Sequence, residues 1–448
     1  MSTLDAKDSS KDLNDNMFPE ESPKNSKNEP CIPKVNMLNH HNDQENKSIL
    51  KKSFEKIFNQ GHAIDDEELT TVCAPGRVNL IGGHTDYCQG FVFPLAIGLK
   101  TYVIGMLNNT ESTVNVFSEN IPEDSPEAPS NFVSLDLKDI KSTKFLPEDN
   151  RRWANYIIGV LACFHNPSTL KGVNIGIRSE VPLGGGLSSS ASLEVGVYTF
   201  LEEVFIDPAN DKIQKATLCR KAENEYAGLP CGIMDQLICA TAKVGHVTLI
   251  DCEFLYKSKY VAMADQEVVF LITDSNVKHE LSGSEYPERK RATERAAEAC
   301  GKKSLRHVRN EDLERVREEN KLDETTLMRA KHVVTENSIT TSAAEALKVG
   351  DYESVGAYMF QSHNSLSKLY DVSCDEQDKL VEIVKDCEGV YGSRMTGGGF
   401  GGCTVTLVEK RRVSEVIDKI HREYFKSFDK TATFYITQPN EGARVLMF

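Results

Sequence analysis

The sequence lacks the features that would assign it to a membrane, a nucleic acid or an oxidising compartment. Its longest apolar runs, such as FVFPLAIGL at 91–99, are far too short to span a bilayer. The 448 residues carry a formal net charge of −15, which argues against a nucleic-acid partner. The 12 cysteines include no CxxC pair, and the opening residues MSTLDAKDSS have no apolar signal-peptide core. We therefore predict reduced, mostly buried thiols in a cytoplasmic protein.

Aromatic residues are scarce at the start of the chain. Residues 1–48 are rich in Asn, Ser, Lys, Asp and Glu and contain one aromatic, Phe18. Such a segment cannot bury enough apolar surface to offset its ordering entropy, so we predict a disordered extension. The only tryptophan, Trp153, shares a helical face with Tyr156 and Ile157, which favours a core position over a cofactor platform.

Glycine and serine are concentrated in VPLGGGLSSSASLEV, residues 181–195. The preceding Val173, Ile175 and Ile177 alternate with polar or small residues, as in a strand, and the following residues are typical of an apolar helix. Glycines let backbone N–H groups approach a ligand closely, and a helix N-terminus favours a negative group. The stretch predicts a nucleotide phosphate loop; a glycine-rich turn with serine caps is the alternative. It is not a Walker A loop, because no Gly-Lys-Ser/Thr follows.

A second polar cluster lies in residues 70–99, which we interpret as strands around a turn at Pro75-Gly76. Arg77, His84 and Asp86 surround two glycines there, a combination suited to a ligand with many hydroxyl groups. A polar hairpin loop is the alternative.

One carboxylate stands in an apolar setting. Asp235 lies in CGIMDQLICA (231–240), where a charge needs a partner or a task, although helix capping is the alternative. A preceding helix over about 211–227 carries Glu223.

The C-terminal half reads as strands (245–252 and 268–273), a helical region (284 to about 385), and a glycine loop between strands (389–409). Gly397, Gly399 and Gly402 fit GxGxxG, but a strand follows where a dinucleotide site needs a helix, so we reject a Rossmann fold. This half is predicted to be α+β with helices on one face of an antiparallel sheet.

Three pieces, APGRVNLIGGHTDY (74–87), PLGGGLSSSAS (182–192) and GSRMTGGGFGGCTV (392–405), together resemble the three signature motifs of the GHMP small-molecule kinases. The first piece, with RRWANY (151–156), AGLPCGIMDQ (227–236) and SEYP (284–287), is similar to galactokinases of the animal type. The resemblance runs from about residue 50 to the C-terminus.

The resemblance implies a role for each matching residue. Asp235 is the implied base, and Arg77 is the implied stabiliser of charge beside it. The implied sugar-binding positions are Arg77, Gly83, His84, Asp86, Gly232, Asp235 and Tyr286. The implied ATP-binding positions are Gly184, Gly186, Ser188, Ser189 and Ser190 of the phosphate loop, and Trp153 beside the adenine. Ser190 and Glu223 match side chains near Mg²⁺, and Gly398 and Gly399 match the third motif.

The implied fold is α/β (α+β) with two domains, 49–245 and 246–448, and the active site in the cleft between them. The first domain would resemble the ribosomal-protein-type second domain, and the second a ferredoxin-like layer. The implied reaction is phosphorylation of the anomeric hydroxyl of α-D-galactose, the entry step of galactose catabolism, with ATP as co-substrate and Mg²⁺ as cofactor. We expect a monomer. An N-acetylgalactosamine kinase and a catalytically weak galactose/ATP sensor are the alternatives; the intact serine run and Asp235 argue against the sensor.

One position departs from the family pattern. The family has Glu where this chain has Gly83, directly before His84. Loss of a carboxylate that binds a sugar hydroxyl predicts weaker sugar binding, with a water filling part of the gap. A lesser departure is Glu280, in a segment that borders the nucleotide in the family.

Overall fold

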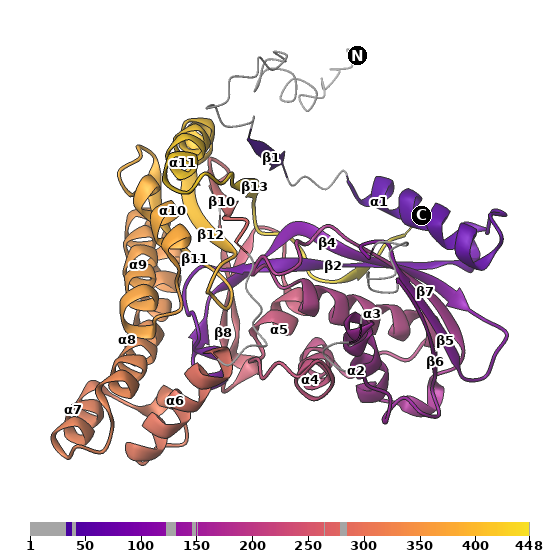
Figure 1. The fold of residues 1–448 in the computed structure, drawn as a ribbon, viewed down its shortest axis with the longest axis horizontal. Coiled ribbons are helices and arrows are strands. Elements are labelled where there is room, and N and C mark those ends of the chain that lie inside the picture. The colour runs from indigo at the N-terminus through magenta and orange to yellow at the C-terminus, as the bar shows by residue number, and fades with distance from the viewer. Residues whose placement is uncertain are drawn as a thin grey trace, which may run out of the picture.

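The computed structural model describes residues 33–37, 42–121, 131–145, 149, 151–263, 265–277 and 285–447. Figure 1 shows two lobes: a broad sheet with helices packed beneath it, and a stack of long helices beside a second sheet. The mixed α/β class with two domains is thus confirmed. Glu280 lies outside the described residues.

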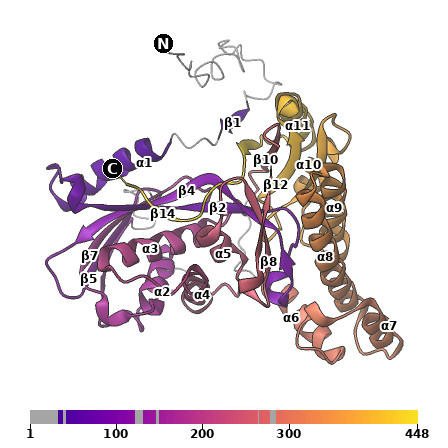
Figure 2. The same ribbon diagram turned by 180° about the vertical axis from the view of Figure 1, so that it is seen from behind.

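The first lobe is built on a six-stranded sheet in the order β14-β2-β4-β7-β5-β6. Its strands are β2 (Thr70–Asn79), β4 (Pro94–Leu107), β5 (Thr113–Ser118), β6 (Phe132–Asp136), β7 (Val173–Ser179) and β14 (Arg444–Val445). Its helices are α1 (Asn42–Phe58), α2 (Asn155–Cys163), α3 (Ser189–Phe205), α4 (Lys212–Ala222) and α5 (Met234–Thr241). Helix α1 lies on one face of the sheet and the other four lie on the opposite face (Figures 1 and 2).

The residues of strand β4 show why helices cover both faces of the six-stranded sheet. Its residues alternate between two cores: Tyr102 and Ile104 pack with Phe54 of α1, whereas Val103 packs with Val195 of α3. Because successive side chains of a strand point to opposite faces, a continuous apolar run requires a partner on each side.

The second lobe contains a five-stranded sheet in the order β1-β13-β10-β12-β11. Its strands are β1 (Lys34–Met37), β10 (Val268–Asp274), β11 (Val390–Met395), β12 (Cys403–Glu409) and β13 (Thr433–Thr437). Its helices are α6 (Glu285–Ala299), α7 (Asn310–Glu318), α8 (Glu324–Lys348), α9 (Tyr352–Ser365), α10 (Asp375–Lys385) and α11 (Val413–Phe428). Leu271 faces α10 and α11, while Phe270 and Ile272 face a core that includes α8 and α9. The expectation of helices on one face only was therefore wrong: the apolar run at the start of β10, residues 268–272, needs cover on both faces.

A small sheet joins the lobes. It has the order β3-β8-β9, from β3 (Phe91–Val92), β8 (His246–Asp251) and β9 (Lys259–Ala262). One core cluster also spans both lobes, with Leu95 of β4 packed among residues such as Phe270 and Ile339. Short turns complete the elements: 3-10 helices η1 (Asp66–Glu68), η2 (Asp86–Cys88), η3 (Arg152–Ala154), η4 (Pro167–Thr169), η6 (Leu255–Lys257), η7 (Leu305–His307) and η9 (Lys410–Arg412), and π-helices η5 (Glu223–Ala227) and η8 (Leu366–Tyr370).

The expected turn at Pro75-Gly76 is absent. Strand β2 is continuous through it, with a bulge between Pro75 and Arg77. A Cβ atom at Gly76 would lie 2.7 Å from the carbonyl oxygen of Leu187, so the glycine serves close approach to the phosphate loop rather than chain reversal. Bulges re-aim the side chains that follow them, and the residue re-aimed here is Arg77.

The ordered structure begins earlier than residue 49, so this boundary of the expected disordered extension was wrong for the described part. Strand β1 pairs in parallel with β13, and α1 begins at Asn42. Asp43 explains why: its carboxylate accepts hydrogen bonds from Lys100 Nζ at 2.8 Å, from the Tyr102 hydroxyl at 2.8 Å and from Arg444 at 2.5 Å. Composition favours disorder when apolar residues are few, but it does not register ion pairs with distant strands. Residues 1–32 lie outside the described part.

The chain ends are exchanged between the lobes. Strand β14 pairs with β2 of the first lobe, although residues 444–445 lie in the second predicted domain, and β1 completes the sheet of the second lobe. The cut at 245/246 therefore does not divide the two sheets at their outer strands. Among the described residues, no helix is both long and apolar enough to cross a membrane, and the described cysteines are all free.

Candidate active site

The centre of the site is an ion pair between Arg77 and Asp235. Arg77 Nε and Nη2 each donate to one carboxylate oxygen of Asp235, both at 2.7 Å. The Arg77 side chain is 5 % exposed and that of Asp235 is 23 % exposed, so the carboxylate is the member of the pair that solvent or a ligand can reach. Burial works against the charge of Arg77, but the attraction of Asp235 outweighs it and raises the pKa of the guanidinium.

The same two residues are tied to the phosphate loop. Arg77 Nη1 donates to the carbonyl oxygen of Gly186 at 2.6 Å, and the Ser188 hydroxyl donates to Asp235 Oδ2 at 2.5 Å. Ser188 has a left-handed backbone with φ of +63°, which is uncommon for a residue other than glycine. Its hydroxyl is therefore directed to the carboxylate, a partner that the sequence motif alone did not indicate.

The phosphate loop is shaped by glycines on both sides. Gly184 and Gly186 each have φ of +73°, and the loop leads into the N-terminus of α3, where free N–H groups favour an anion. A Cβ atom at Gly397 would lie 2.6 Å from the Gly186 carbonyl oxygen, and one at Gly402 would lie 2.8 Å from that of Gly185. The third motif thus supports the phosphate loop through these two glycines.

Gly398 and Gly399, the third-motif glycines predicted for the site, have different neighbours from Gly397 and Gly402. A Cβ atom at Gly399 would meet the Val372 carbonyl oxygen at 2.1 Å, and the Gly398 backbone lies near the His84 ring, where it favours the protonated imidazole. Gly399 therefore packs against the second lobe, and Gly398 lies beside the first motif.

The predicted sugar-binding residues lie together beside this pair. A Cβ atom at Gly232 would lie 2.0 Å from Asp86 Oδ2, so only glycine permits this approach. The ring of Tyr286 packs 5.6 Å from that of His84, centroid to centroid. Burial, followed by the charge of Asp235, raises the pKa of Asp86 to about 6. Burial lowers the pKa of His84 to about 3, so its imidazole is neutral at physiological pH.

Sequence reasoning missed two tyrosines that orient His84. Nδ1 of His84 lies 2.8 Å from the Tyr87 hydroxyl, which in turn lies 2.8 Å from the hydroxyl of Tyr370. Tyr87 stands within the HTDY motif and could have been chosen from its spacing, since the residue three positions beyond His84 is close to it. Tyr370 comes from the other lobe, and no local pattern marks it.

The residues predicted to lie near Mg²⁺ are adjacent. Burial raises the pKa of Glu223 to about 7, and the nearby Ser190 hydroxyl opposes that rise. Gln236 Nε2 donates to Glu223 Oε2 at 2.5 Å, and Glu223 Oε1 is buried without a hydrogen-bond partner in the described structure. Carboxylate and hydroxyl oxygens suit Mg²⁺, which normally takes one or two protein ligands and completes its shell with water and phosphate. In the described part of the chain, no group of three or more His, Cys, Asp or Glu side chains forms a metal site.

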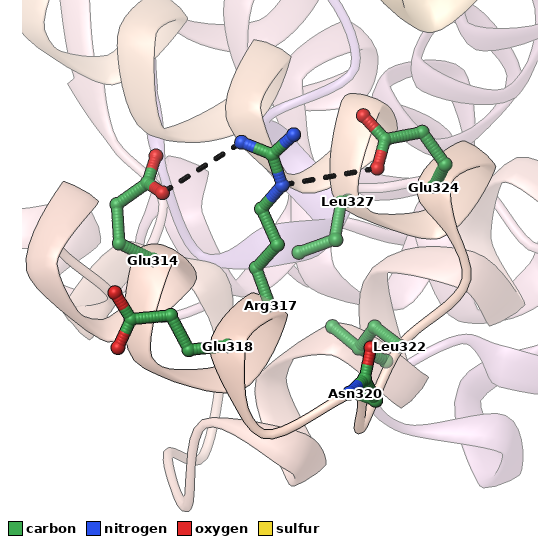
Figure 3. A pocket seen from close by; sticks show the side chains of 7 residues that line it. All are labelled: Glu314, Arg317, Glu318, Asn320, Leu322, Glu324 and Leu327. Carbon is green, nitrogen blue, oxygen red and sulfur yellow. Dashed lines mark ion pairs between the residues drawn. The ribbon is translucent and has the colours of Figure 1, made fainter.

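The tryptophan and a surface pocket are two further features of the described structure. Trp153 packs against the core of the first lobe, as its helical spacing predicted. A surface pocket lies at the outer end of the helical stack, between α7 and the start of α8, where Arg317 pairs with Glu314 and Glu324 at 3.8 and 4.0 Å (Figure 3). None of the predicted site residues lines it.

Comparison with known proteins identifies the same regions. The galactokinase galactose-binding signature matches residues 52–106, the GHMP kinase N-terminal domain matches 155–243, and the GHMP kinase C-terminal domain matches 343–427. The chain is 46 % identical to a galactokinase of Canis lupus familiaris and 45 % identical to one of Homo sapiens, each match covering 84 % of this chain and 92 % of the relative.

Solved structures of related kinases have the same fold as this chain. The Lactococcus lactis galactokinase complexed with galactose superposes with a TM-score of 0.81 at 32 % identity, covering 89 % of this chain and 100 % of the other. Methanococcus jannaschii mevalonate kinase, at 19 % identity and a TM-score of 0.59 over 84 % of this chain and 99 % of its own, shares the fold. Both lobes and all three motifs are covered by these matches, and the chain belongs to the galactokinase family, the sugar kinases of the GHMP group.

Proposed function

We propose that this protein transfers the γ-phosphoryl group of ATP to the anomeric hydroxyl of α-D-galactose, forming galactose 1-phosphate and ADP. The observation that carries the proposal is the partly exposed Asp235 carboxylate, held in two-point contact by Arg77. The pair lies between the glycine phosphate loop and the cluster of His84, Asp86 and Tyr286. A base placed between a phosphate site and a polyol site is the arrangement that phosphoryl transfer to a hydroxyl requires.

Asp235 acts as the base in this proposal. As the anomeric oxygen bonds to the γ-phosphorus, its proton passes to an Asp235 oxygen, and the bond from the γ-phosphorus to the β,γ-bridging oxygen breaks to release ADP. Arg77 holds the Asp235 carboxylate in place before transfer and offsets negative charge on the moving group during it. The proton later leaves to solvent, which reaches the carboxylate.

The other side chains bind and orient the substrates. Asp86, ionised above a pH of about 6, accepts hydrogen bonds from sugar hydroxyls, and neutral His84 contributes one donor or acceptor. The N-terminus of α3 and the phosphate-loop glycines would bind the ATP phosphates, and Trp153 would line the adenine pocket. Ser190 and Glu223 would hold Mg²⁺, which supplies neutralisation of phosphate charge when bound.

The substrate is tested by an ADP-release assay over galactose, N-acetylgalactosamine, glucose and their 1-deoxy analogues, with ³¹P spectroscopy of the product. We expect turnover with galactose, a sugar 1-phosphate as product, and none from 1-deoxygalactose. Turnover only with N-acetylgalactosamine would identify the acetamido-sugar kinase. Binding of ATP and galactose without ADP release would identify a sensor, a function against which the intact Arg77–Asp235 pair argues.

A further inference from the structure

The backbone of the sugar-binding loop, residues 82–86, is held in an unfavourable conformation. Gly82 has φ of +96°, and His84, which is not a glycine, has φ of +60°. A Cβ atom at Gly82 would lie 2.5 Å from the carbonyl oxygen of Phe91. Residues in such sparsely populated regions persist only where the surrounding structure determines their conformation, and they cluster at ligand sites. The groups that hold this loop are therefore informative.

The side chains that hold this loop in place come from the second lobe. Oε1 of Glu336, on α8, accepts hydrogen bonds from the backbone N–H of Gly82 at 2.9 Å and of Gly83 at 3.0 Å. Nε2 of His332, one turn earlier on α8, lies 3.0 Å from the Gly83 carbonyl oxygen, so this nitrogen carries the proton and donates. The Ser362 hydroxyl on α9 also donates to Glu336 Oε1, at 2.5 Å. We call His332, Glu336 and Ser362 the α8 clamp.

The clamp side chains contact the loop backbone and are shielded from solvent. All three of its side chains are fully buried. Burial lowers the pKa of His332, which keeps its ring neutral and in the tautomer that donates to Gly83. A buried carboxylate is costly unless hydrogen-bonded. Oε1 of Glu336 receives all three hydrogen bonds, from the loop and from Ser362, whereas Oε2 has no hydrogen-bond partner in the described structure.

Gly83 also lies close against side chains of the second lobe. A Cβ atom there would lie 2.7 Å from Nη2 of Arg394 and 3.1 Å from Leu366, so the place of a side chain is already occupied. The water expected beside Gly83 stays a prediction, and the groups that border this position are a guanidinium and an apolar side chain. Arg394 is fully buried, and its Nη1 donates to the Asn79 carbonyl oxygen at 3.2 Å. Glu336 favours the charge of Arg394, although burial lowers the pKa of the guanidinium to about 10.

We propose that Glu336 and His332 are positioning residues of the sugar site: through the backbone of Gly82 and Gly83 they hold the loop in the conformation that places His84 and Asp86 beside Asp235. The proposal rests on the proposed function, because it assigns the loop to sugar binding. It follows that the sugar pocket, although its ligating side chains belong mainly to the first lobe, is formed only when the second lobe is packed against it.

The test compares Glu336→Ala with Glu336→Gln. Glutamine retains a carbonyl oxygen able to accept from both N–H groups, whereas alanine removes the acceptor. We expect Glu336→Ala to raise the galactose KM about tenfold or more, as the loss of charge-assisted hydrogen bonds implies. The dissociation constant for ATP should stay within about twofold, because the side-chain hydrogen bonds of the clamp in the described structure join it to Gly82, Gly83 and Ser365 and not to the phosphate loop. Glu336→Gln should keep the galactose KM within about threefold. Glu345→Ala, an exposed carboxylate on the same helix, is the matched control.

A readout independent of turnover is amide hydrogen exchange of a peptide spanning residues 80–88. Exchange should speed up in Glu336→Ala and not in Glu336→Gln, because only alanine frees the two loop N–H groups. If Glu336→Ala does not fold, Glu336→Asp, which withdraws the acceptor by one methylene, takes its place in both measurements.

Equal losses of sugar and ATP binding, or unchanged sugar binding together with unchanged exchange, would overturn the proposal. If the wild-type protein phosphorylates no sugar, the proposed function fails, whereas the exchange experiment still decides whether the clamp holds the loop.

Discussion

Asp235 is the residue on which the chemistry depends most directly. We expect Asp235→Ala to lower kcat at least about a thousandfold, because the variant loses both the proton acceptor and the partner that orients Arg77. The ATP dissociation constant should change far less than kcat, since the phosphate loop loses only the Ser188 hydrogen bond to Asp235 and keeps the bond from Arg77 to Gly186. Single-turnover kinetics and nucleotide titration measure the two quantities. Near-wild-type turnover in the variant would remove Asp235 from the role of base.

Asp86 should make sugar binding depend on pH. Its pKa is raised to about 6 by burial and by the charge of Asp235, while Arg77 opposes that rise. The carboxyl is therefore protonated below a pH of about 6 and loses its full capacity to accept from sugar hydroxyls. We expect the galactose KM to rise as pH falls from 7 to 5. His84 contributes nothing over this range, because its pKa is about 3.

The measurement for Asp86 is the galactose KM at half-unit steps of pH, with Asp86→Asn beside the wild type. The asparagine variant should have a higher KM that no longer depends on pH in this range. A wild-type profile that is flat between pH 5 and 7 would contradict the assignment. The sign is opposite for stability. Because the folded state binds the proton of Asp86 more tightly than the unfolded chain does, this group stabilises the fold most below a pH of 3.8, and that contribution is lost as pH rises from 3.8 to about 6.

At the scale of elements, the ordered N-terminal segment changes what a truncation should do. Residues 1–32 are polar in composition with a single aromatic, Phe18, and have little apolar surface to pack, so their removal is expected to leave sugar kinase activity within about threefold. Removal of residues 1–45 deletes β1 and Asp43, which leaves the Lys100 ammonium, 3 % exposed, without its carboxylate. Breaking such a pair costs about 3 kcal/mol, and we expect a clearly lower melting temperature.

Point variants separate the ion pair from the rest of the deletion. Asp43→Ala in the full chain should reproduce most of the loss in melting temperature, and Glu45→Ala, exposed on the same helix, should not. Equal melting temperatures for the two truncated proteins would show that the contacts of residues 46–58, such as those of Leu50 and Phe54, hold α1 without Asp43.

The elements themselves were largely predictable. Apolar periodicity predicted the helix after the phosphate loop, and the strand after the third glycine motif excluded a dinucleotide fold; both are confirmed by α3 and β12. Pro75 and Gly76 were misread because turn residues also occur at strand bulges. The signal for the bulge is a contact with Leu187, more than a hundred residues away, which no local window contains.

The whole molecule depends on the contact between the third motif and the phosphate loop. A Cβ atom at Gly397 would collide with the Gly186 carbonyl oxygen at 2.6 Å, and the backbone there has φ of +85°. We expect Gly397→Ala to raise the KM for ATP about tenfold or more by displacing the loop. Gly350→Ala is the matched control, because Gly350 has a similar φ of +76° but open space around it.

The control should cost about 1 kcal/mol of stability with little change in the KM for ATP. If the two alanine variants behave alike, backbone strain alone explains the effect and the contact between the lobes has no special role.

The site was predictable where the chemistry is carried by side chains within one motif, and less so where it depends on the meeting of lobes. Arg77, Asp235, His84 and Asp86 stand in short motifs, and the structure brings them together. Tyr370 reaches His84 through Tyr87 from another lobe, and its own neighbours in sequence carry no signal. Which chain segments pack together is a property of the folded whole, and a single sequence does not encode it locally.

The exchanged chain ends have a consequence for synthesis. Strand β2 is complete once residue 79 has been made, but the strand that covers its outer edge, β14, contains residues 444–445. At about 5–20 residues per second, a ribosome takes about 20 to 70 seconds to cover that interval. Throughout it, the first lobe presents a sheet edge with unpaired backbone groups, the template on which chains associate wrongly. Nascent chains of this protein should therefore depend on chaperones until translation ends, and a stalled ribosome should leave an aggregation-prone fragment.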